Sequence, residues 1–517
     1  MSGQPTTRPR CPEIRPAEVH VPPQPLARFS DLVGPEAARA GDALARETAE
    51  RLAGRVMWHV NSTAHGGGVA EMLRPLIGYA RGAGIDARWL VIGGTPEFFL
   101  ITKRLHNALH GDPGDGGPLG EAEREAYEQV LRCNHSELAA YVRPGDVVVL
   151  HDPQTAGLAP VLARAGAVVV WRSHIGQDDN ERPLVRRGWE FLSPYLAAPR
   201  ATVFSRAAYI PGVCDSGRSH VIRPSIDPFS PKNQELAPEV VRSILVQTGI
   251  VEGPADGVAP VFRREDGSPE RVDRGADLIR VGRAPSIDTP LVVQISRWDR
   301  LKDHLGVMRG FARLDPSEAR GAQLVLAGPT VSAVADDPGG PEVLAELTAA
   351  WRALPHETRR RIQLVSLPMV DAQENQAIVN ALQRQAAIVV QKSLHEGFGL
   401  TVTEAMWKGR PVVASAVGGI VDQVRDGVDG VLLPDPADDD AFADALQGLL
   451  SDPGRARRLG ESARERAARD FLGLRHLGDW ARLLRELDEA GPDAGGPQGG
   501  SERAPMRRAR PGGTLVP

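Results

Sequence analysis

The chain has 517 residues, of which 42% are apolar and 25% are charged, and its net charge is −5. A single hydrophobic core stops growing beyond roughly 250–300 residues, so this length predicts two domains. The acidic balance argues against nucleic acid as the main partner, and no apolar run approaches the ~20 residues that span a bilayer. The three cysteines are far apart, and no apolar leader begins the chain. We therefore expect a reduced, cytoplasmic protein without membrane contact.

Short apolar runs alternate with helical patterns in the first half of the chain. Strands are predicted at residues 55–60, 87–92, 146–150, 167–171 and 201–205. These runs are continuously apolar, as are the strands of a parallel sheet that helices cover on both faces. Residues 26–230 therefore predict a Rossmann-like domain. The Pro- and Arg-rich residues 1–25 are expected to form a disordered tail.

A Pro-rich stretch at residues 223–233 interrupts the pattern and is predicted to be the linker. The alternation restarts beyond it, with strands predicted at residues 291–295, 323–327, 362–366, 387–390, 411–414 and 430–433. Residues 231–470 therefore predict a second Rossmann-like domain. The polar segment 258–289 is expected as an exposed insertion in it. A last amphipathic helix, within residues 471–490, is expected to cross back to the first domain, and residues 491–517 to form a disordered tail.

Polar residues gather where the predicted strands of the first domain end. Parallel strands end at a common edge, which is where doubly wound sheets bind ligands. The candidates at this edge are Gly66, Gly67, Gly68, Asp152, Gln154 and His174. The absence of side chains lets the glycine loop approach a ligand closely, and the next helix directs its positive end toward it. A flexible turn is the alternative for the glycines, and a core role is the alternative for a lone histidine.

Residues 391–420 combine a strand end, a glycine-rich turn and a helix start. Backbone N–H groups freed by Gly397 and Gly399 and by the helix start favour a bound anion. Glu396 and Glu404 bracket this turn. Each carboxylate alone is more often a partner of the helix dipole. Together they favour a ligand site, with Glu404 accepting from a ribose hydroxyl and Glu396 near the reacting sugar.

Two cations, Arg297 and Lys302, follow the strand at residues 291–295. Two cations that converge with a helix N-terminus predict a diphosphate site, whereas a solvated basic loop is the alternative. The run at residues 438–440 is Asp-Asp-Asp, but it precedes an apolar-periodic segment and is predicted to cap a helix. No metal site is predicted, and Mg²⁺ is left open. Without a metal ion, the two cations and the helix dipole would stabilise the leaving diphosphate.

These residues resemble the retaining, two-domain GT-B glycosyltransferases of the glycogen-synthase-like family 4. The acidic pair with its turn glycines matches the acidic signature of that family, and Arg297 with Lys302 matches its diphosphate pair. Longer segments resemble the trehalose glycosyltransferring synthases within the family, namely residues 59–73, 97–111, 151–158, 171–175, 224–233 and 380–413. The implied fold is two facing Rossmann-like domains with parallel sheets and a C-terminal helix that crosses back. The resemblance implies that residues 26–230 form the acceptor-side domain and that residues 231–470 bind the nucleotide sugar.

The resemblance implies retaining transfer of glucose from a nucleotide-diphosphate glucose to glucose, which gives trehalose and a nucleoside diphosphate. It implies sugars and a sugar nucleotide as partners and no tightly bound cofactor. The implied catalytic residues are Glu396, Arg297, Lys302 and His174. The implied nucleotide-binding residues are Gly66, Gly67, Gly68, Arg297, Lys302, Gly397, Phe398, Gly399, Leu400, Thr401 and Glu404. The implied substrate residues are Asp152, Gln154 and His174.

Three departures from the family pattern concern the acceptor side. They are the long insertion at residues 258–289, Ile175-Gly176 after the histidine, and His395 before Glu396. The alternatives are a trehalose phosphorylase-like enzyme, a family 4 glycosyltransferase with another small acceptor, and a non-catalytic sensor of sugar nucleotides. The nucleotide base, the direction of the reaction and the oligomeric state, including a homodimer, stay open.

Overall fold

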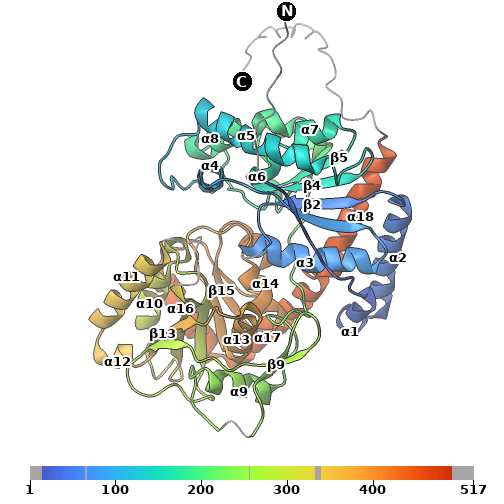
Figure 1. Ribbon diagram of the computed structural model, residues 1–517. Coiled ribbons are helices and arrows are strands. Elements are labelled where there is room, and N and C mark those ends of the chain that lie inside the picture. The colour runs from blue at the N-terminus through green and yellow to red at the C-terminus, as the bar shows by residue number, and fades with distance from the viewer. Residues whose placement is uncertain (1–13, 65–66, 255–256, 332–338, 492–517) are drawn as a thin grey trace, which may run out of the picture.

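The computed structural model describes residues 14–64, 67–254, 257–331 and 339–491. Two seven-stranded sheets, each flanked by helices, form an upper and a lower domain in Figure 1. The strand orders are β1-β3-β2-β4-β5-β6-β7 and β10-β13-β12-β11-β14-β15-β16. The edge strands β1 and β10 pair antiparallel with their neighbours. The other neighbouring strands of each sheet pair in parallel, for example β2 with β4 in the first sheet and β11 with β14 in the second. This is the predicted architecture of two Rossmann-like domains.

The first sheet lies between residues 17 and 221. Its strands are β1 (Ala17–Val19), β2 (Met57–Asn61), β3 (Ala87–Val91), β4 (Val147–His151), β5 (Val168–Arg172), β6 (Ala201–Phe204) and β7 (Ser219–Val221). The α-helices of this part are α1 (Ser30–Val33), α2 (Pro35–Arg51), α3 (Gly67–Gly82), α4 (Pro96–Leu109), α5 (Glu121–Leu138), α6 (Asp152–Ala156), α7 (Ala159–Arg164) and α8 (Pro183–Leu196). Short 3₁₀ turns are η1 (Leu26–Phe29), η2 (Ala207–Tyr209) and η3 (Ser216–Arg218).

The second sheet lies between residues 277 and 433. Its strands are β10 (Asp277–Ile279), β11 (Leu291–Ile295), β12 (Gln323–Pro329), β13 (Ile362–Leu367), β14 (Ile388–Gln391), β15 (Val412–Ser415) and β16 (Val431–Leu433). The helices are α9 (Pro238–Gln247), η4 (Arg300–Lys302), α10 (His304–Ala312), α11 (Gly340–Ala353), α12 (His356–Arg359), α13 (Ala372–Gln385), α14 (Leu400–Trp407), α15 (Ile420–Gln423), α16 (Asp439–Ser451), α17 (Pro453–Asp470) and α18 (Gly473–Glu489).

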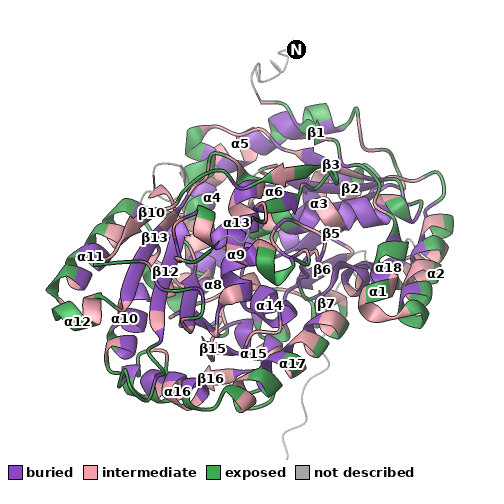
Figure 2. Cartoon of the chain, turned by 90° about the horizontal axis from the view of Figure 1, so that it is seen from below, coloured by how far each residue is buried: buried purple, intermediate pink, exposed green. Residues whose placement is uncertain are grey.

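The central strands form the core of both domains. Every residue of β2, β4 and β11 is buried, which explains why their sequences are mainly apolar. Figure 2 shows this burial in purple along the sheets, with exposed positions on outer helices such as α2 and α12. Because both faces of each sheet are covered, the strand ends are the places left for polar groups to meet a ligand.

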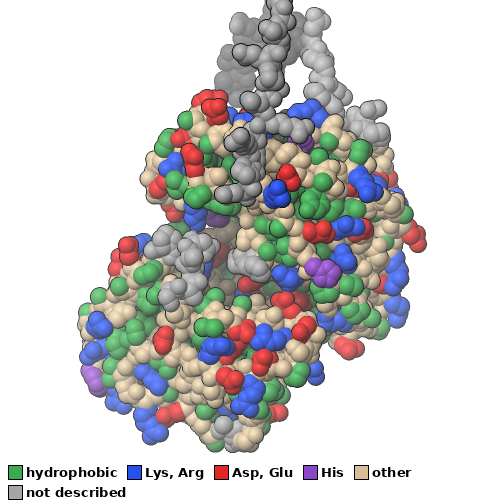
Figure 3. All heavy atoms as spheres, viewed as in Figure 1, with side chains coloured by type: hydrophobic (Ala, Val, Ile, Leu, Met, Phe, Trp, Pro, Cys, Tyr) green, Lys and Arg blue, Asp and Glu red, His purple; other side chains and the backbone are tan. Residues whose placement is uncertain are grey.

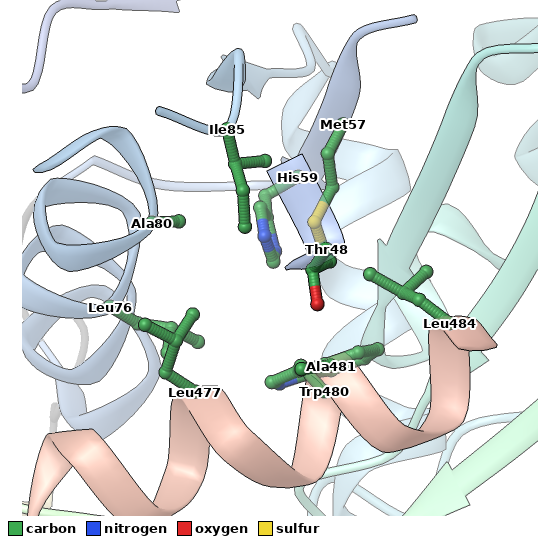
Figure 4. Close-up of a pocket in the computed structure, with 10 residues that line it drawn as sticks. All are labelled: Thr48, Met57, His59, Leu76, Ala80, Ile85, Leu477, Trp480, Ala481 and Leu484. Atoms are coloured by element: carbon green, nitrogen blue, oxygen red, sulfur yellow. The ribbon is translucent and has the colours of Figure 1, made fainter. Parts of the chain in front are cut away.

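The C-terminal helix α18 crosses from the second domain to the first, as the sequence predicts. It packs against α2 and α3, and Asp488 near its end pairs with Arg55 at 3.1 Å. Figure 4 shows a small, mainly apolar cavity between α18 and the first sheet, where Leu477, Trp480 and Leu484 face His59. The last helix of the described residues therefore completes the core of the first domain.

Three expectations from the sequence need correction, and they concern the N-terminal segment, the insertion and the cysteines. The segment 1–25 is not disordered throughout, because residues 17–19 form β1 and pair with β3. The insertion 258–289 holds the hairpin of β8 (Val261–Arg263) and β9 (Pro269–Arg271), but it also supplies β10, an edge strand of the second sheet. Cys133 is disulfide-bonded, contrary to the expected reduced state, whereas Cys214 is free.

The predicted tails at residues 1–13 and 492–517 lie outside the described residues. In the part of the chain that the structure describes, no helix is long and apolar enough to cross a membrane.

Candidate active site

Lys302 and Glu396 meet at the edge of the second sheet that faces the first domain. The Lys302 ammonium donates to Glu396 Oε2 at 2.7 Å, and Ser393 Oγ donates to the same oxygen at 3.2 Å. Both side chains are largely buried, with 15% and 12% of their surfaces exposed. They follow the neighbouring parallel strands β11 and β14, which is why residues so far apart in sequence converge. Figure 3 shows a hollow between the two domains.

A buried polar network holds the loops that carry this pair. Gln294, on β11, donates to the Lys302 carbonyl at 2.8 Å and accepts from the Lys392 backbone N–H at 3.4 Å. The fully buried Lys392 ammonium contacts Asp303 and, at 3.2 Å, Asp439. Asp303 has a φ of 48°, a left-handed conformation that a non-glycine residue rarely adopts. The network therefore fixes a strained turn directly after Lys302.

The glycine-rich turn brings two helix N-termini together. Gly399 has a φ of 82° and forms the N-cap of α14. The start of α3 lies against it, because a Cβ on Gly68 would be 3.4 Å from Leu400 Cδ1. Both helices present the positive ends of their dipoles here, which favours a bound anion. The predicted Gly68 and Leu400 thus lie near one another, Gly67 and Thr401 are their neighbours in the chain, and Gly66 lies outside the described residues.

Glu404 lies in a separate environment from Glu396. It is 3% exposed, and its Oε1 is 3.1 Å from the Lys232 ammonium. Its Oε2 is buried without a hydrogen-bond partner among the described residues. A buried carboxylate oxygen without a partner is costly and fits a ligand hydroxyl that would donate to it. The predicted division of the two glutamates is therefore compatible with the structure.

Arg297 does not share the ion pair of Lys302. Its side chain is 53% exposed, and its Nη2 lies 3.8 Å from Asp299. Its charge helps to lower the pKa of His106, on α4 of the first domain, although burial is the larger cause. Arg297 thus faces the first domain while Lys302 lies deeper.

Asp152 lies at the end of β4 in a strained, buried position. Its φ is 63°, and its Oδ1 accepts the His174 backbone N–H at 2.7 Å. Burial raises the pKa of Asp152 to about 7, against the opposing effects of that hydrogen bond and of Arg172. A strained carboxyl group with a raised pKa at a strand end is typical of a functional position. The predicted Gln154 is partly buried on α6, immediately after it.

His174 reaches the cleft with its backbone, while its ring points into the first domain. A Cβ on Gly397 would lie 3.8 Å from the His174 carbonyl oxygen. The ring Nε2 is 3.0 Å from His151 Nδ1, and His151 Nε2 is 3.1 Å from His59 Nδ1. The predicted contact of the His174 ring with a donor sugar therefore requires this ring to leave its partner His151.

The three stacked histidines have defined proton positions. Arg172 Nε, an obligatory donor, lies 3.4 Å from His174 Nδ1, so this nitrogen accepts. It follows that His174 Nε2–H donates to His151, and His151 Nε2–H donates to His59. Burial is the main cause that lowers the pKa of all three rings, to about 3 for His59. These three histidines, called the histidine relay below, thus form a chain of neutral imidazoles.

Three further residues at the site were not among the predicted site residues, although His110 lies in the resembling segment 97–111. His110, at the end of α4, faces the turn, since a Cβ on Gly397 would be 3.6 Å from its Cε1. Burial lowers the pKa of His110 to about 4, although Glu396 opposes this shift. Tyr209 donates to the Gly397 carbonyl at 2.6 Å, and Arg206 lies 3.1 Å from Asp422. These contacts join the two domains beside the predicted sugar residue, Glu396.

The Asp-rich run at residues 438–440 caps a helix, as predicted. Asp438 accepts the backbone N–H groups of Asp440 and Ala441 at the start of α16. Asp439 pairs with Arg309 at 2.8 Å. Within the described ranges, no group of three or more His, Cys, Asp or Glu side chains has an arrangement that could hold a metal ion.

Comparison with known proteins identifies the family. The family model "Trehalose synthase, N-terminal domain" matches residues 59–211, and "Glycosyl transferases group 1" matches residues 281–466. The trehalose synthase of Pyrococcus horikoshii is 34% identical over 444 residues, which are 86% of this chain and 92% of that protein. The chain belongs to the trehalose synthase family of glycosyltransferases. The trehalose synthase of Rubrobacter xylanophilus is 35% identical over 86% of this chain and 93% of its own length.

The fold agrees with solved glycosyltransferases at lower identity. The α,α-trehalose 6-phosphate synthase of Burkholderia multivorans superposes with a TM-score of 0.59 at 17% identity, over 84% of this chain and 99% of that chain. Anabaena HepE, in complex with UDP and glucose, superposes with a TM-score of 0.53 at 14% identity, over 84% and 100% of the two chains. Both support the GT-B fold that the sequence resemblance implied.

A trehalose phosphorylase of Pleurotus pulmonarius is a more distant relative of this trehalose synthase family member. It is 26% identical over 82% of this chain, which matches 56% of that protein.

Proposed function

We propose that this enzyme transfers glucose from a nucleotide-diphosphate glucose to glucose with retention, and so forms trehalose and a nucleoside diphosphate. The observation that carries the proposal is the Lys302–Glu396 pair beside two converging helix N-termini, in a chain 34% identical to a trehalose synthase. The HepE structure, a complex with UDP and glucose, supports a nucleotide sugar as the donor class.

In the proposed reaction the bond between the sugar C1 and the diphosphate oxygen breaks, and C1 bonds to an acceptor hydroxyl on the same face. The acceptor proton passes to the leaving diphosphate, so no enzyme nucleophile is needed. Lys302 has three N–H donors, and Glu396 occupies one of them. The remaining donors, Arg297 and the N-termini of α3 and α14 would stabilise the diphosphate charge. Glu396 would then hold the sugar hydroxyls.

Two groups from the first domain complete the proposed acceptor side. Asp152 and His110 both have shifted pKa values because of burial, so the acid is largely protonated below pH 7 and the imidazole is neutral. A neutral imidazole and a protonated carboxyl group can each donate and accept a hydrogen bond. Such groups suit the hydroxyls of an uncharged sugar. Divalent metal assistance of the leaving group stays open.

The alternative is a phosphorylase that splits trehalose with inorganic phosphate, since trehalose phosphorylases are among the relatives. The test incubates the protein with glucose and each of ADP-, UDP- and GDP-glucose, and identifies any disaccharide by the NMR signals of its anomeric protons. A second assay supplies trehalose with phosphate or with each nucleoside diphosphate. Formation of glucose 1-phosphate in the phosphate reaction alone would replace the proposal with the phosphorylase. A protein that binds nucleotide sugars and forms no product would be a sensor.

A further inference from the structure

Lys232, in the linker between the domains, binds one carboxylate from each side of the cleft. Its ammonium lies 3.2 Å from Glu71 on α3 of the first domain and 3.1 Å from Glu404 on α14 of the second. Both helices begin at the site, where Gly68 faces Leu400. In Figure 1, α3 and α14 lie side by side at the boundary between the domains. One side chain thus connects the two helices whose N-termini converge.

The linker holds Lys232 firmly in this place. On one side, Tyr79 donates to Asp227 at 2.5 Å. On the other side, Asn380 donates to the Pro231 carbonyl at 3.0 Å, and Trp407 donates to the Asn233 carbonyl at 3.0 Å. Ordering of a long lysine side chain costs conformational entropy, and here the backbone on either side of it is already fixed. The position of Lys232 is therefore built by the fold and is not an incidental surface contact.

Lys232 is also the cation that matches the buried charge of Glu404. Lys408 is nearby, but its ammonium donates to Asn233 Oδ1 at 2.9 Å and to the Glu404 backbone carbonyl at 3.3 Å. Burial lowers the pKa of Lys408 well below its usual value. For Lys232, burial acts in the same direction, but Glu404 and Glu71 outweigh it and raise the pKa. Lys232 therefore stays charged and is placed to balance the Glu404 carboxylate in a buried site.

We propose that Lys232 is a positioning residue for the nucleoside of the donor. It holds Glu404 with Oε1 engaged and Oε2 directed to a ribose hydroxyl, and through Glu71 it couples this contact to the glycine-loop helix of the other domain. The inference rests on the proposed function, because it assigns the ribose to Glu404. It assigns a role to a residue that lies in the resembling segment 224–233 but was not among the predicted site residues.

The test compares a ligand that has a ribose with one that lacks it. Dissociation constants for ADP, UDP, GDP and inorganic pyrophosphate are measured by calorimetry on the full-length protein and on Lys232→Met, Glu404→Gln and the double variant. We expect Lys232→Met to weaken the preferred nucleoside diphosphate by about tenfold or more, because a buried carboxylate without its cation is neutralised or displaced. Pyrophosphate affinity should fall by less than about threefold, because pyrophosphate has no ribose and is affected only by the loss of the lysine charge. The double variant should bind no more weakly than the weaker single variant.

Three controls keep the outcome clear. Lys232→Arg, which preserves the charge, should restore nucleoside diphosphate affinity to within about threefold, and Lys232→Gln replaces the Met variant if that variant does not fold. Arg313→Met removes an exposed ion pair with Asp440 on the outer surface and should change no affinity. Equal weakening of pyrophosphate and nucleoside diphosphate, or additive effects in the double variant, would overturn the role of Lys232. A wild-type protein that binds pyrophosphate but no nucleoside diphosphate would instead reject the proposed function.

Discussion

Tyr209 of the first domain donates a hydrogen bond to the backbone carbonyl of Gly397 in the second, at 2.6 Å. The acceptor lies next to Glu396, so the position of the proposed sugar residue depends on a contact across the domain boundary. Arg206, three residues earlier, reinforces this contact through the Gly418 carbonyl at 2.5 Å. The relative position of the domains and the geometry of the turn are therefore linked.

The first prediction concerns this contact. Tyr209→Phe should lower kcat/KM several-fold, while the loss of one hydrogen bond costs only about 1 kcal/mol of stability. Steady-state kinetics and thermal unfolding measure the two effects. Tyr195→Phe is the matched control, because Tyr195 donates to Glu128 within the first domain at 2.7 Å. Equal kinetic effects of both variants would show that the contact across the boundary has no special role.

The second prediction concerns the proposed stabilisation of the leaving group. Lys302→Met should lower kcat by about 10²–10³-fold, the usual cost of removing one donor aimed at developing charge. Product formation under saturating donor measures the effect. Arg300→Met controls for changes in the same turn, since Arg300 is turned outward and bonds Glu346 at 2.5 Å. Near-normal turnover of the Lys302 variant would remove this residue from the mechanism.

The third prediction uses the raised pKa of Asp152. A folded pKa of about 7 exceeds the unfolded value, so the native state retains a proton that the unfolded state loses, and stability falls as pH rises between about 4 and 7. Asp152→Asn removes this penalty. When the pH is raised from 5 to 8, the unfolding free energy of the variant should rise by about 3 kcal/mol relative to that of the wild type, because only the wild type loses stability through this group. Urea titrations of both proteins at the two pH values measure this change. A stability difference between them that is the same at pH 5 and pH 8 would contradict the raised pKa of Asp152.

The fourth prediction concerns the buried histidine relay. The pKa of His59 is lowered to about 3, so the unfolded state takes up a proton below about pH 6.5 while the native state does not, and stability is lost as pH falls. His59→Asn keeps an acceptor for His151 but cannot titrate. Between pH 7.5 and 5 the variant should lose about 2 kcal/mol less than the wild type. Urea titrations at both pH values test this expectation. It would be contradicted if the wild type and the variant lost the same stability between pH 7.5 and 5.

The sequence predicted the positions that depend on strand order and missed those that depend on side-chain packing. Lys302 and Glu396 were expected to be close because they follow neighbouring parallel strands. The inward ring of His174 was not, since it depends on hydrogen bonds to His151 and Arg172. Lys232 lies in the resembling segment 224–233, but nothing in that segment indicates its contact with Glu71, which is 161 residues away in the chain. The edge strand β1 was missed because its three residues bury little surface and show no apolar period.

The crossing of α18 has a consequence for the order of folding. Its apolar face, with Leu477, Trp480 and Leu484, covers the first domain against α2 and α3. The ribosome synthesises these residues after the strands of both sheets, so the first domain must wait with an open apolar face until the second has been made. A chain that stops before residue 473 would keep a complete second domain and expose the core of the first. A stop codon just before α18 would therefore inactivate the enzyme, because the N-terminal domain would remain incomplete.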